Sequence, residues 1–273
     1  MLTDAVIGDE FTVSFSKVTQ DHGVYFVPTY AEHRPASRAV LTGGGVGTDV
    51  LQAIARHEKT PDLDWSRVWV WWGDERFVDF GDSERNDAQA DQALLGSLPL
   101  DPAQIVRFPA ANEGLDLEDA AAQFRARLQQ MGSAGQWPEF DLALAGMGPD
   151  GHVLSVFPGR DEALADQPDI RAVRNSPKPP AERLTMTLPL VNRSARVWLV
   201  VTGAEKAAAL GLALAEVATL EVPAAGLAGR ESTKVFIDQE LAGLLPAELV
   251  NRELFWSAED ERADYVPKAL REP

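Results

Sequence analysis

Residues 140–159 hold the feature that most constrains the fold, an apolar run that ends abruptly in three closely spaced glycines. The run, Leu142 to Ala145, has the composition of a strand buried on both faces of a parallel sheet. Open α/β sheets bind ligands at the carboxyl ends of such strands. Glycines at that point let backbone N–H groups come close to a ligand. The segment therefore predicts an α/β protein with a binding site just beyond this strand.

The turn after this run delivers a histidine. Gly146, Gly148 and Gly151 surround Asp150 and lead directly to His152. An imidazole at this place titrates near neutral pH and can serve as a general base. A solitary histidine in a turn more commonly only hydrogen-bonds to the backbone. A catalytic interpretation of His152 therefore depends on the other motifs of the chain.

Strands and helices alternate along most of the sequence. We expect strands at 39–42, 68–72, 105–108, 142–145, 183–188, 196–202 and 235–238, and helices at 48–58, 86–95, 117–131, 205–220 and 239–245. This alternation predicts an α/β fold with a mostly parallel sheet and helices on both faces. The stiff segment Pro177-Lys-Pro-Pro is too short for a domain linker, so we expect one domain over residues 1–273.

The two ends of the chain fit this alternation less well. Residues 11–15 and 24–27 have the pattern of short strands, and no amphipathic helix is evident within residues 1–37. The tail after Glu253 is charged, and we expect it to fray.

The composition excludes several classes of function. The formal net charge of −17 disfavours nucleic acids and anionic membranes as partners, since both need a basic surface. A locally positive site can still bind a small anion. The chain has no cysteine, which excludes disulfides and thiol chemistry. No signal peptide and no run of about 18 apolar residues is present, so we expect a cytoplasmic protein.

A second glycine-rich turn follows the strand that ends at Thr42. Gly43, Gly44 and Gly45 stand between this strand and the next helix. Backbone N–H groups at a helix N-terminus bind anions, so a phosphate is the natural ligand, although a tight turn without a ligand explains the glycines equally well. A dinucleotide fingerprint would need a glycine where Thr48 stands, and no Walker Gly-Lys-Ser/Thr follows.

Charged residues follow the expected strand at 68–72. Asp74 can orient a base or act as one, and Arg76 can bind an anion through two hydrogen bonds. The alternative is a solvated turn that carries an internal ion pair.

A lysine follows the expected strand at 196–202. Lys206 lies in the first turn of the next helix, where its charge opposes the helix dipole, so an anion bound at that helix end explains it better. Arg183 supplies a second positive charge if it lies on the same face. A surface ion pair with Glu182 explains Arg183 as well.

Other kinds of site find little support in the sequence. The four histidines form no pair or histidine–carboxylate cluster with a known metal-ligand spacing. A serine triad through Ser155 lacks the G-x-S-x-G turn that such enzymes use.

Taken together, five ordered motifs resemble the 6-phosphogluconolactonase family, part of a wider group that includes the glucosamine-6-phosphate deaminases. They lie between residues 39 and 245 and comprise Thr42-Gly-Gly-Gly, Trp72-Gly-Asp-Glu-Arg, Gly146-Met-Gly-Pro-Asp-Gly-His with Ser155-Val-Phe-Pro-Gly, Pro179-Pro-Ala-Glu-Arg-Leu-Thr-Met-Thr-Leu, and Val201-Thr-Gly-Ala-Glu-Lys. The resemblance implies a modified Rossmann-like sheet. It also implies hydrolysis of 6-phosphoglucono-δ-lactone to 6-phosphogluconate, a step of the pentose phosphate pathway, without a cofactor.

The resemblance further implies roles for individual residues. His152 is expected as the general base, with Asp74 beside it to steer its ionisation or the substrate hydroxyls. The expected substrate- and phosphate-binding residues are Gly43, Gly44, Gly45, Arg76, Asn86, Arg183 and Lys206. The turn that contains Gly148, Asp150 and Gly151 is expected to stabilise the developing oxyanion. The expected partner is a small anionic sugar phosphate, and the expected state is a monomer or weak dimer.

The chain departs from the family pattern in three places. The glycine turn lacks the hydroxyl groups of the common Ser-Gly-Gly-Ser-Thr-Pro, so backbone and Thr42 or Thr48 must do more. Arg85-Asn86-Asp87 stands where Ser-Asn-Tyr is common, so only Asn86 carries over. Residues 1–37 lack the usual strand and amphipathic helix.

Three other functions remain open alongside the expected lactonase. A glucosamine-6-phosphate deaminase or isomerase typically has a glutamate where this chain has Phe157, and a tyrosine where it has Arg76. A sugar-phosphate sensor without turnover would keep the same fold. A nicotinamide-dependent dehydrogenase is disfavoured by the failed dinucleotide fingerprint.

Overall fold

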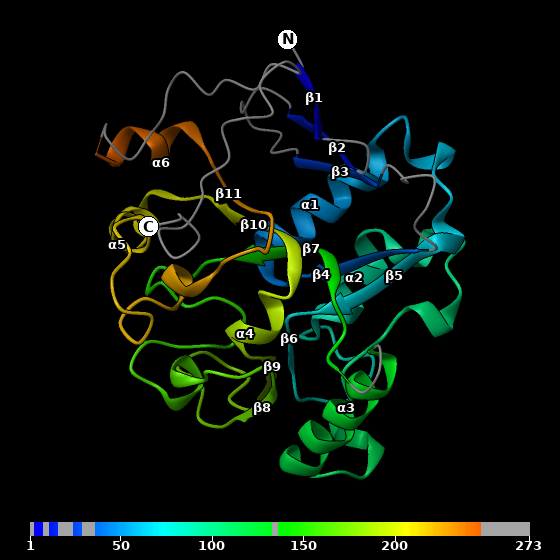
Figure 1. Ribbon diagram of the computed structural model, residues 1–273. Coiled ribbons are helices and arrows are strands. Elements are labelled where there is room, and N and C mark those ends of the chain that lie inside the picture. Colours follow the sequence, from blue (N-terminus) through cyan, green and yellow to red (C-terminus); the bar gives the residue numbers. More distant parts are fainter. Residues whose placement is uncertain (1–2, 8–10, 16–23, 29–35, 133–135, 247–273) are drawn as a thin grey trace.

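A five-stranded parallel sheet forms the centre of the protein (Figure 1). The computed structural model describes residues 3–7, 11–15, 24–28, 36–132 and 136–246. The sheet has the order β11-β10-β7-β4-β5, with every neighbouring pair parallel. Its strands are β4 (Ser37–Leu41), β5 (Val68–Trp72), β7 (Phe140–Gly146), β10 (Ser194–Val201) and β11 (Ser232–Ile237). The predicted α/β class with a mostly parallel sheet is confirmed.

The apolar run of β7 lies in the middle of this sheet. Leu142 pairs with Ala39 on β4 and with Arg196 on β10. Every β7 residue before Gly146 is buried, as expected for a strand covered on both faces. Large side chains from the neighbouring strands, Trp71, Trp72 and Trp198, are also fully buried and fill the core.

The path of the chain reverses direction within the sheet. After β4 the chain moves outward to β5, then returns to β7 on the other side of β4. Open parallel sheets typically bind ligands at such a reversal, which here lies beyond the carboxyl ends of β4 and β7. The backbone N–H of Gly146 donates to Thr42 Oγ1 at 3.3 Å and joins the two turns at that point.

Six helices are found in the described residues: α1 (Gly44–Arg56), α2 (Asn86–Ala93), α3 (Leu117–Met131), α4 (Leu188–Val191), α5 (Ala207–Leu214) and α6 (Gln239–Leu244). The expected helix at 117–131 is confirmed with its bounds. Helix α1 begins four residues earlier than predicted, so Gly44 and Gly45 belong to its first turn.

The predicted helix at 205–220 is too long. Helix α5 ends at Leu214, because Ala215 closes it and Glu216 adopts a left-handed φ of +56°. A predicted strand was also wrong: residues 105–108 form only an isolated bridge between Ile105 and Val70. Pro109 follows at once and cannot donate to a ladder.

A second sheet, of three antiparallel strands, was not predicted as such. Its order is β6-β9-β8, with β6 (Asp74–Arg76), β8 (Ile170–Val173) and β9 (Arg183–Met186). The predicted strand at 183–188 is shorter because α4 begins at Leu188. This sheet brings Asp74 opposite Thr185.

The N-terminal region forms a third sheet of antiparallel strands, β1 (Thr3–Ile7), β2 (Phe11–Phe15) and β3 (Val24–Pro28). The two strands predicted here are confirmed, and β3 lies against α1. The prediction for the tail after Glu253 falls outside the described residues.

Candidate active site

The N-terminus of α1 is open and free of acidic side chains. Gly43 caps the helix in an extended conformation, and no acidic residue lies in the first turn. Gly44 has a φ of +75°, which favours glycine there. A Cβ atom on Gly44 or Gly45 would meet nothing within 4 Å. The surface at this helix end is therefore open, and the first N–H groups of a helix are favourable anion ligands.

The turn after β7 is built around the His152 imidazole. A Cβ atom on Gly148 would lie 2.2 Å from His152 Nδ1, so only glycine leaves room for the ring. Nδ1 lies 2.5 Å from Asp150 Oδ1. The ring packs on Phe157, with centroids 4.7 Å apart. Its side chain is 14% exposed, enough for one edge to reach solvent.

These contacts fix the protonation state of His152. The Asp150 carboxylate only accepts hydrogen bonds, so Nδ1 carries the proton and Nε2 keeps its lone pair. Burial lowers the pKa of His152 below its ordinary value, more than Asp150 raises it, and Lys178 also lowers it. The imidazole is therefore neutral at pH 7, with Nε2 able to accept a proton.

Asp74 is held by a hydroxyl and a guanidinium. Ser155 Oγ donates to Asp74 Oδ2 at 2.6 Å, and Arg183 Nη1 lies 4.0 Å from the same oxygen. Arg183 also lies over the Phe157 ring, 6.0 Å from its centroid. Phe157 thus contacts both Arg183 and the histidine. The predicted residues Asp74, Arg183 and His152 come together in one place.

Positive charge gathers around this place in a chain that is acidic overall. Arg76 and Arg183 lie directly opposite each other on β6 and β9, and their repulsion is offset in part by Asp74, which lies 4.0 Å from Arg183. Lys206 lies just before α5, and β10, which leads to it, is the neighbour of β7. In the described part of the chain, no hydrogen bond or ion pair engages the Lys206 ammonium.

Lys178 is a further cation that sequence reasoning missed. It lies in the Pro177-Lys-Pro-Pro segment, which was interpreted only as a stiff loop. Its charge lowers the pKa of Lys206, after the larger effect of burial, and it also acts on His152. The Lys178 carbonyl accepts from Arg183 Nη2 at 3.1 Å. The sequence did offer a signal for this cation, since Lys178 stands among prolines shortly before the expected strand that carries Arg183.

The expected oxyanion donors are already engaged within their turn. The Gly148 N–H donates to the His152 carbonyl at 2.9 Å, and the Gly151 N–H donates to the Gly148 carbonyl at 3.0 Å. Gly151 has a φ of +82°, and a Cβ there would lie 2.7 Å from Val222. These glycines shape the turn. Their predicted role in binding the oxyanion stays a prediction. It would require each N–H group to donate to the oxyanion as well as to its present carbonyl partner.

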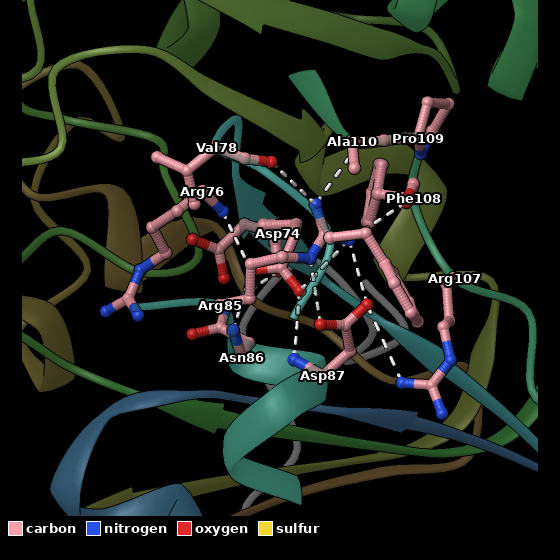
Figure 2. Close-up of polar contacts among 12 residues, drawn as sticks. Asp74, Arg76, Val78, Arg85, Asn86, Asp87, Arg107, Phe108, Pro109 and Ala110 are labelled. Atoms are coloured by element: carbon pink, nitrogen blue, oxygen red, sulfur yellow. Dashed lines mark hydrogen bonds and ion pairs between the residues drawn. The ribbon is translucent and has the colours of Figure 1, made fainter. Parts of the chain in front are cut away.

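A buried charge cluster beside the site was also missed. Arg85 is completely buried and pairs with Asp87 through two hydrogen bonds (Figure 2). Glu75 lies 3.8 Å from the same guanidinium. Burial and the neighbouring Asp87 raise the pKa of Glu75 to about 7. Asn86, predicted to bind substrate, lies between this cluster and the start of α1.

Comparison with known proteins identifies the family. The family model described as glucosamine-6-phosphate isomerases/6-phosphogluconolactonase matches residues 26–236. The chain belongs to this family. The 6-phosphogluconolactonase of Streptomyces coelicolor is 40% identical over 221 residues, 79% of this chain and 85% of that protein. The 6-phosphogluconolactonase of Mycobacterium leprae is 41% identical over 216 residues, 78% of this chain and 87% of that protein.

Solved structures agree on the fold of the family. The crystal structure of 6-phosphogluconolactonase from Thermotoga maritima superimposes with a TM-score of 0.65 at 25% identity, covering 76% of this chain and 87% of that one. The modified Rossmann-like sheet expected from the resemblance is confirmed by this match.

The described residues offer neither a metal-binding cluster nor a membrane-spanning helix. In the ranges that the structure describes, no three His, Cys, Asp or Glu side chains are grouped so that they could hold a metal ion. None of the helices described there is long and apolar enough to cross a membrane.

Proposed function

We propose that this chain hydrolyses 6-phosphoglucono-δ-lactone to 6-phosphogluconate, with His152 as the general base that activates water. Relatives about 40% identical over most of the chain carry the name 6-phosphogluconolactonase, which supports a lactone hydrolase. The observation that carries the mechanism is the placement of the His152 imidazole, whose Nδ1 lies 2.5 Å from Asp150 Oδ1 so that Nε2 is left available. Burial and Lys178 lower its pKa, which favours the neutral form that accepts a proton. The reaction belongs to the pentose phosphate pathway.

The chemistry needs few groups because a δ-lactone is an activated ester. Nε2 of His152 takes a proton from water as the water oxygen attacks the lactone carbonyl carbon. The tetrahedral intermediate then collapses, and the bond to the ring oxygen breaks. The imidazolium returns its proton to that oxygen, which leaves as a hydroxyl group. One such general base contributes about 10²–10⁴-fold.

The phosphate anchors the substrate away from the reacting carbon. The N–H groups of Gly44 and Gly45 and the ammonium of Lys206 are the proposed phosphate ligands. Arg76 and Arg183 face each other nearer to Asp74 and supply further positive charge. Binding energy gained at the phosphate orients the carbonyl against His152, which raises the rate of the chemical step.

Phe157 argues against the deaminase alternative. It stands where deaminases of the family typically carry a glutamate, and its apolar ring fills the space beside His152. No carboxylate can act from that position. A non-catalytic sensor is the remaining alternative, and it would bind the phosphosugar without turnover.

The direct test is proton release from freshly made 6-phosphoglucono-δ-lactone, measured against spontaneous hydrolysis. Acceleration by the folded protein would support the lactonase. Binding without acceleration would leave the sensor, and release of ammonia from glucosamine 6-phosphate would establish the deaminase instead.

Replacing Lys206 with alanine is expected to raise KM for the lactone by about tenfold or more, because a partly desolvated charge on the phosphate is lost. The kcat value should change much less, since the phosphate lies away from the reacting carbon. Lys59→Ala, in a 3-10 turn beyond the carboxyl end of α1, is the matched control and should leave KM unchanged. An unchanged KM in Lys206→Ala would remove Lys206 from the phosphate site.

The pH dependence should report the lowered pKa of His152. Only the neutral imidazole accepts a proton, so kcat/KM should rise with pH through that pKa and reach its plateau at a lower pH than an ordinary histidine, with its value of 6.5, would give. Lys178→Gln removes a cation that disfavours the imidazolium, so it should move the acid limb to higher pH.

The measurement is kcat/KM from pH 4 to 8 after subtraction of spontaneous hydrolysis, with Lys59→Gln as the control. An acid limb centred above 6.5 in the unmodified protein would contradict the assignment of His152 as a buried base.

A further inference from the structure

Two residues that depart from the family pattern, Arg85 and Asp87, pair with each other in the structure. Arg85 and Asp87 stand where Ser and Tyr are common, on either side of Asn86. Arg85 Nε donates to Asp87 Oδ1 at 2.9 Å, and Nη2 donates to Oδ2 at 2.8 Å. This is the two-pronged geometry that makes an arginine–carboxylate pair strong and directional.

We propose that Glu75, Arg85 and Asp87 form a positioning cluster that holds Asn86 against the glycine turn of α1, and so fixes the phosphate end of the site relative to Asp74. None of the three is a catalytic residue, because each is almost completely buried. The kinetic part of this inference rests on the proposed lactonase function.

The cluster is complete in its own hydrogen bonds. Glu75 and Asp87 are each 1% exposed, and Arg85 is 0% exposed. The remaining Arg85 N–H groups donate to backbone carbonyls, those of Phe108 at 2.9 Å and of Val78 and Pro109 at 3.4 Å (Figure 2). A buried ion pair costs free energy to desolvate, and its presence alone is weak evidence for stability. Holding a neighbouring residue in place is a better reason for it.

Asn86 is the residue that the cluster holds. Glu75 accepts the N–H of Asn86 at 2.7 Å and that of Asp87 at 2.9 Å, so its carboxylate caps the start of α2. Asn86 Nδ2 then donates to the Asp74 carbonyl at 2.8 Å. A carbonyl only accepts, so this bond fixes which way the amide of Asn86 points.

The other end of the Asn86 amide touches the turn of α1. Its Oδ1 is buried without a hydrogen-bond partner. It lies 1.8 Å from where a Cβ on Gly43 would be, so the amide packs directly on the Gly43 backbone. Asn86 therefore spans the distance between the cap of α1 and the strand that carries Asp74. A small shift of Asn86 would move the proposed phosphate site on α1 relative to the proposed base, His152. Misplacing a substrate in this way lowers reaction rates steeply.

The test is a double-mutant cycle in kcat/KM between Arg85→Ser and Asn86→Ala, with each rate taken per folded molecule from circular dichroism. If Arg85 acts through Asn86, each single variant should lower kcat/KM by about tenfold or more, and the double variant should be no worse than the poorer single. Losses that multiply would overturn the proposal, as would an unchanged kcat/KM in Arg85→Ser.

Two further variants separate positioning from general stability. Arg125→Ser breaks the ion pair of Arg125 with Asp169, between α3 and the residue before β8, and should lower the melting temperature without changing kcat/KM. Asp87→Asn keeps the size of the side chain but weakens its pairing with Arg85, so it should lower kcat/KM in the same direction as Arg85→Ser. An unchanged kcat/KM in Asp87→Asn would overturn the proposal. Should Arg85→Ser not fold, the isosteric Asp87→Asn replaces it in the cycle.

A measurement that does not depend on catalysis can test the positioning cluster separately from the proposed lactonase function. The side-chain amide protons of Asn86, followed by NMR, should exchange slowly with solvent in the unmodified protein and faster in Arg85→Ser, but not in Arg125→Ser. Failure of lactone hydrolysis with this exchange pattern intact would reject only the proposed function. Equal exchange in all three proteins would reject the positioning cluster.

Discussion

Replacing His152 with alanine is expected to lower kcat by about 10²–10⁴-fold, the range that a single general base contributes. The KM for 6-phosphoglucono-δ-lactone should change little, because the proposed phosphate ligands lie on α1 and before α5 rather than in the histidine turn. The measurement is proton release by the two proteins at matched concentrations, with spontaneous hydrolysis subtracted.

His57→Ala provides the matched control. His57 follows the last residue of α1, at the opposite end of a 13-residue helix from Gly43. That places it about 20 Å from the helix cap at the usual 1.5 Å per residue. Its loss should leave kcat unchanged. Normal turnover in His152→Ala would exclude His152 as the base, whereas loss of binding would mean that the imidazole also holds the substrate.

Gly148→Ala should be nearly as damaging, although it removes no functional group. The added methyl would lie 2.1 Å from His152 Cε1 and 2.7 Å from Asp150 Oδ1, closer than any packed atoms can be. The imidazole must then leave its place against the carboxylate. We expect kcat to fall by about 10²-fold, the effect of misplacing a reacting group by an ångström.

Gly243→Ala in α6 tests whether a lost glycine matters in general. A Cβ there would meet nothing within 4 Å, and its helical setting favours alanine, so neither kcat nor stability should suffer. The position of the His152 ring in Gly148→Ala can be followed by its NMR titration. An unaltered titration with normal kcat would show that the turn accommodates the methyl group.

Sequence reasoning succeeded where the local pattern and the fold agree. The run of β7 is apolar because both faces are covered, and glycines mark its end, so strand, turn and histidine could all be predicted. Helix α3 has apolar residues at helical spacing, which was enough to predict it. The structure adds an Asp116 side chain that caps it by accepting the Asp119 N–H.

It failed where structure depends on partners that are distant in the chain. Strand β6 consists of Asp74-Glu75-Arg76, which has no apolar alternation, and it becomes a strand only by pairing with β9. The role of Arg85 could not be predicted, because no periodicity shows that a charged side chain will be fully buried. The length of α5 was overestimated because helix propensity does not register the left-handed turn at Glu216.

The return of the chain from β5 to β7 has a consequence for how the protein folds. Ser155 and Asp74 are separated by 81 positions, and Gly146 and Thr42 by 104. Such distant segments meet late, since closing long loops is entropically unfavourable until other contacts hold them. A growing chain released from the ribosome only up to β7 lacks β9 and β10, and therefore Arg183 and Lys206. The proposed site is therefore complete only once the chain extends as far as Lys206.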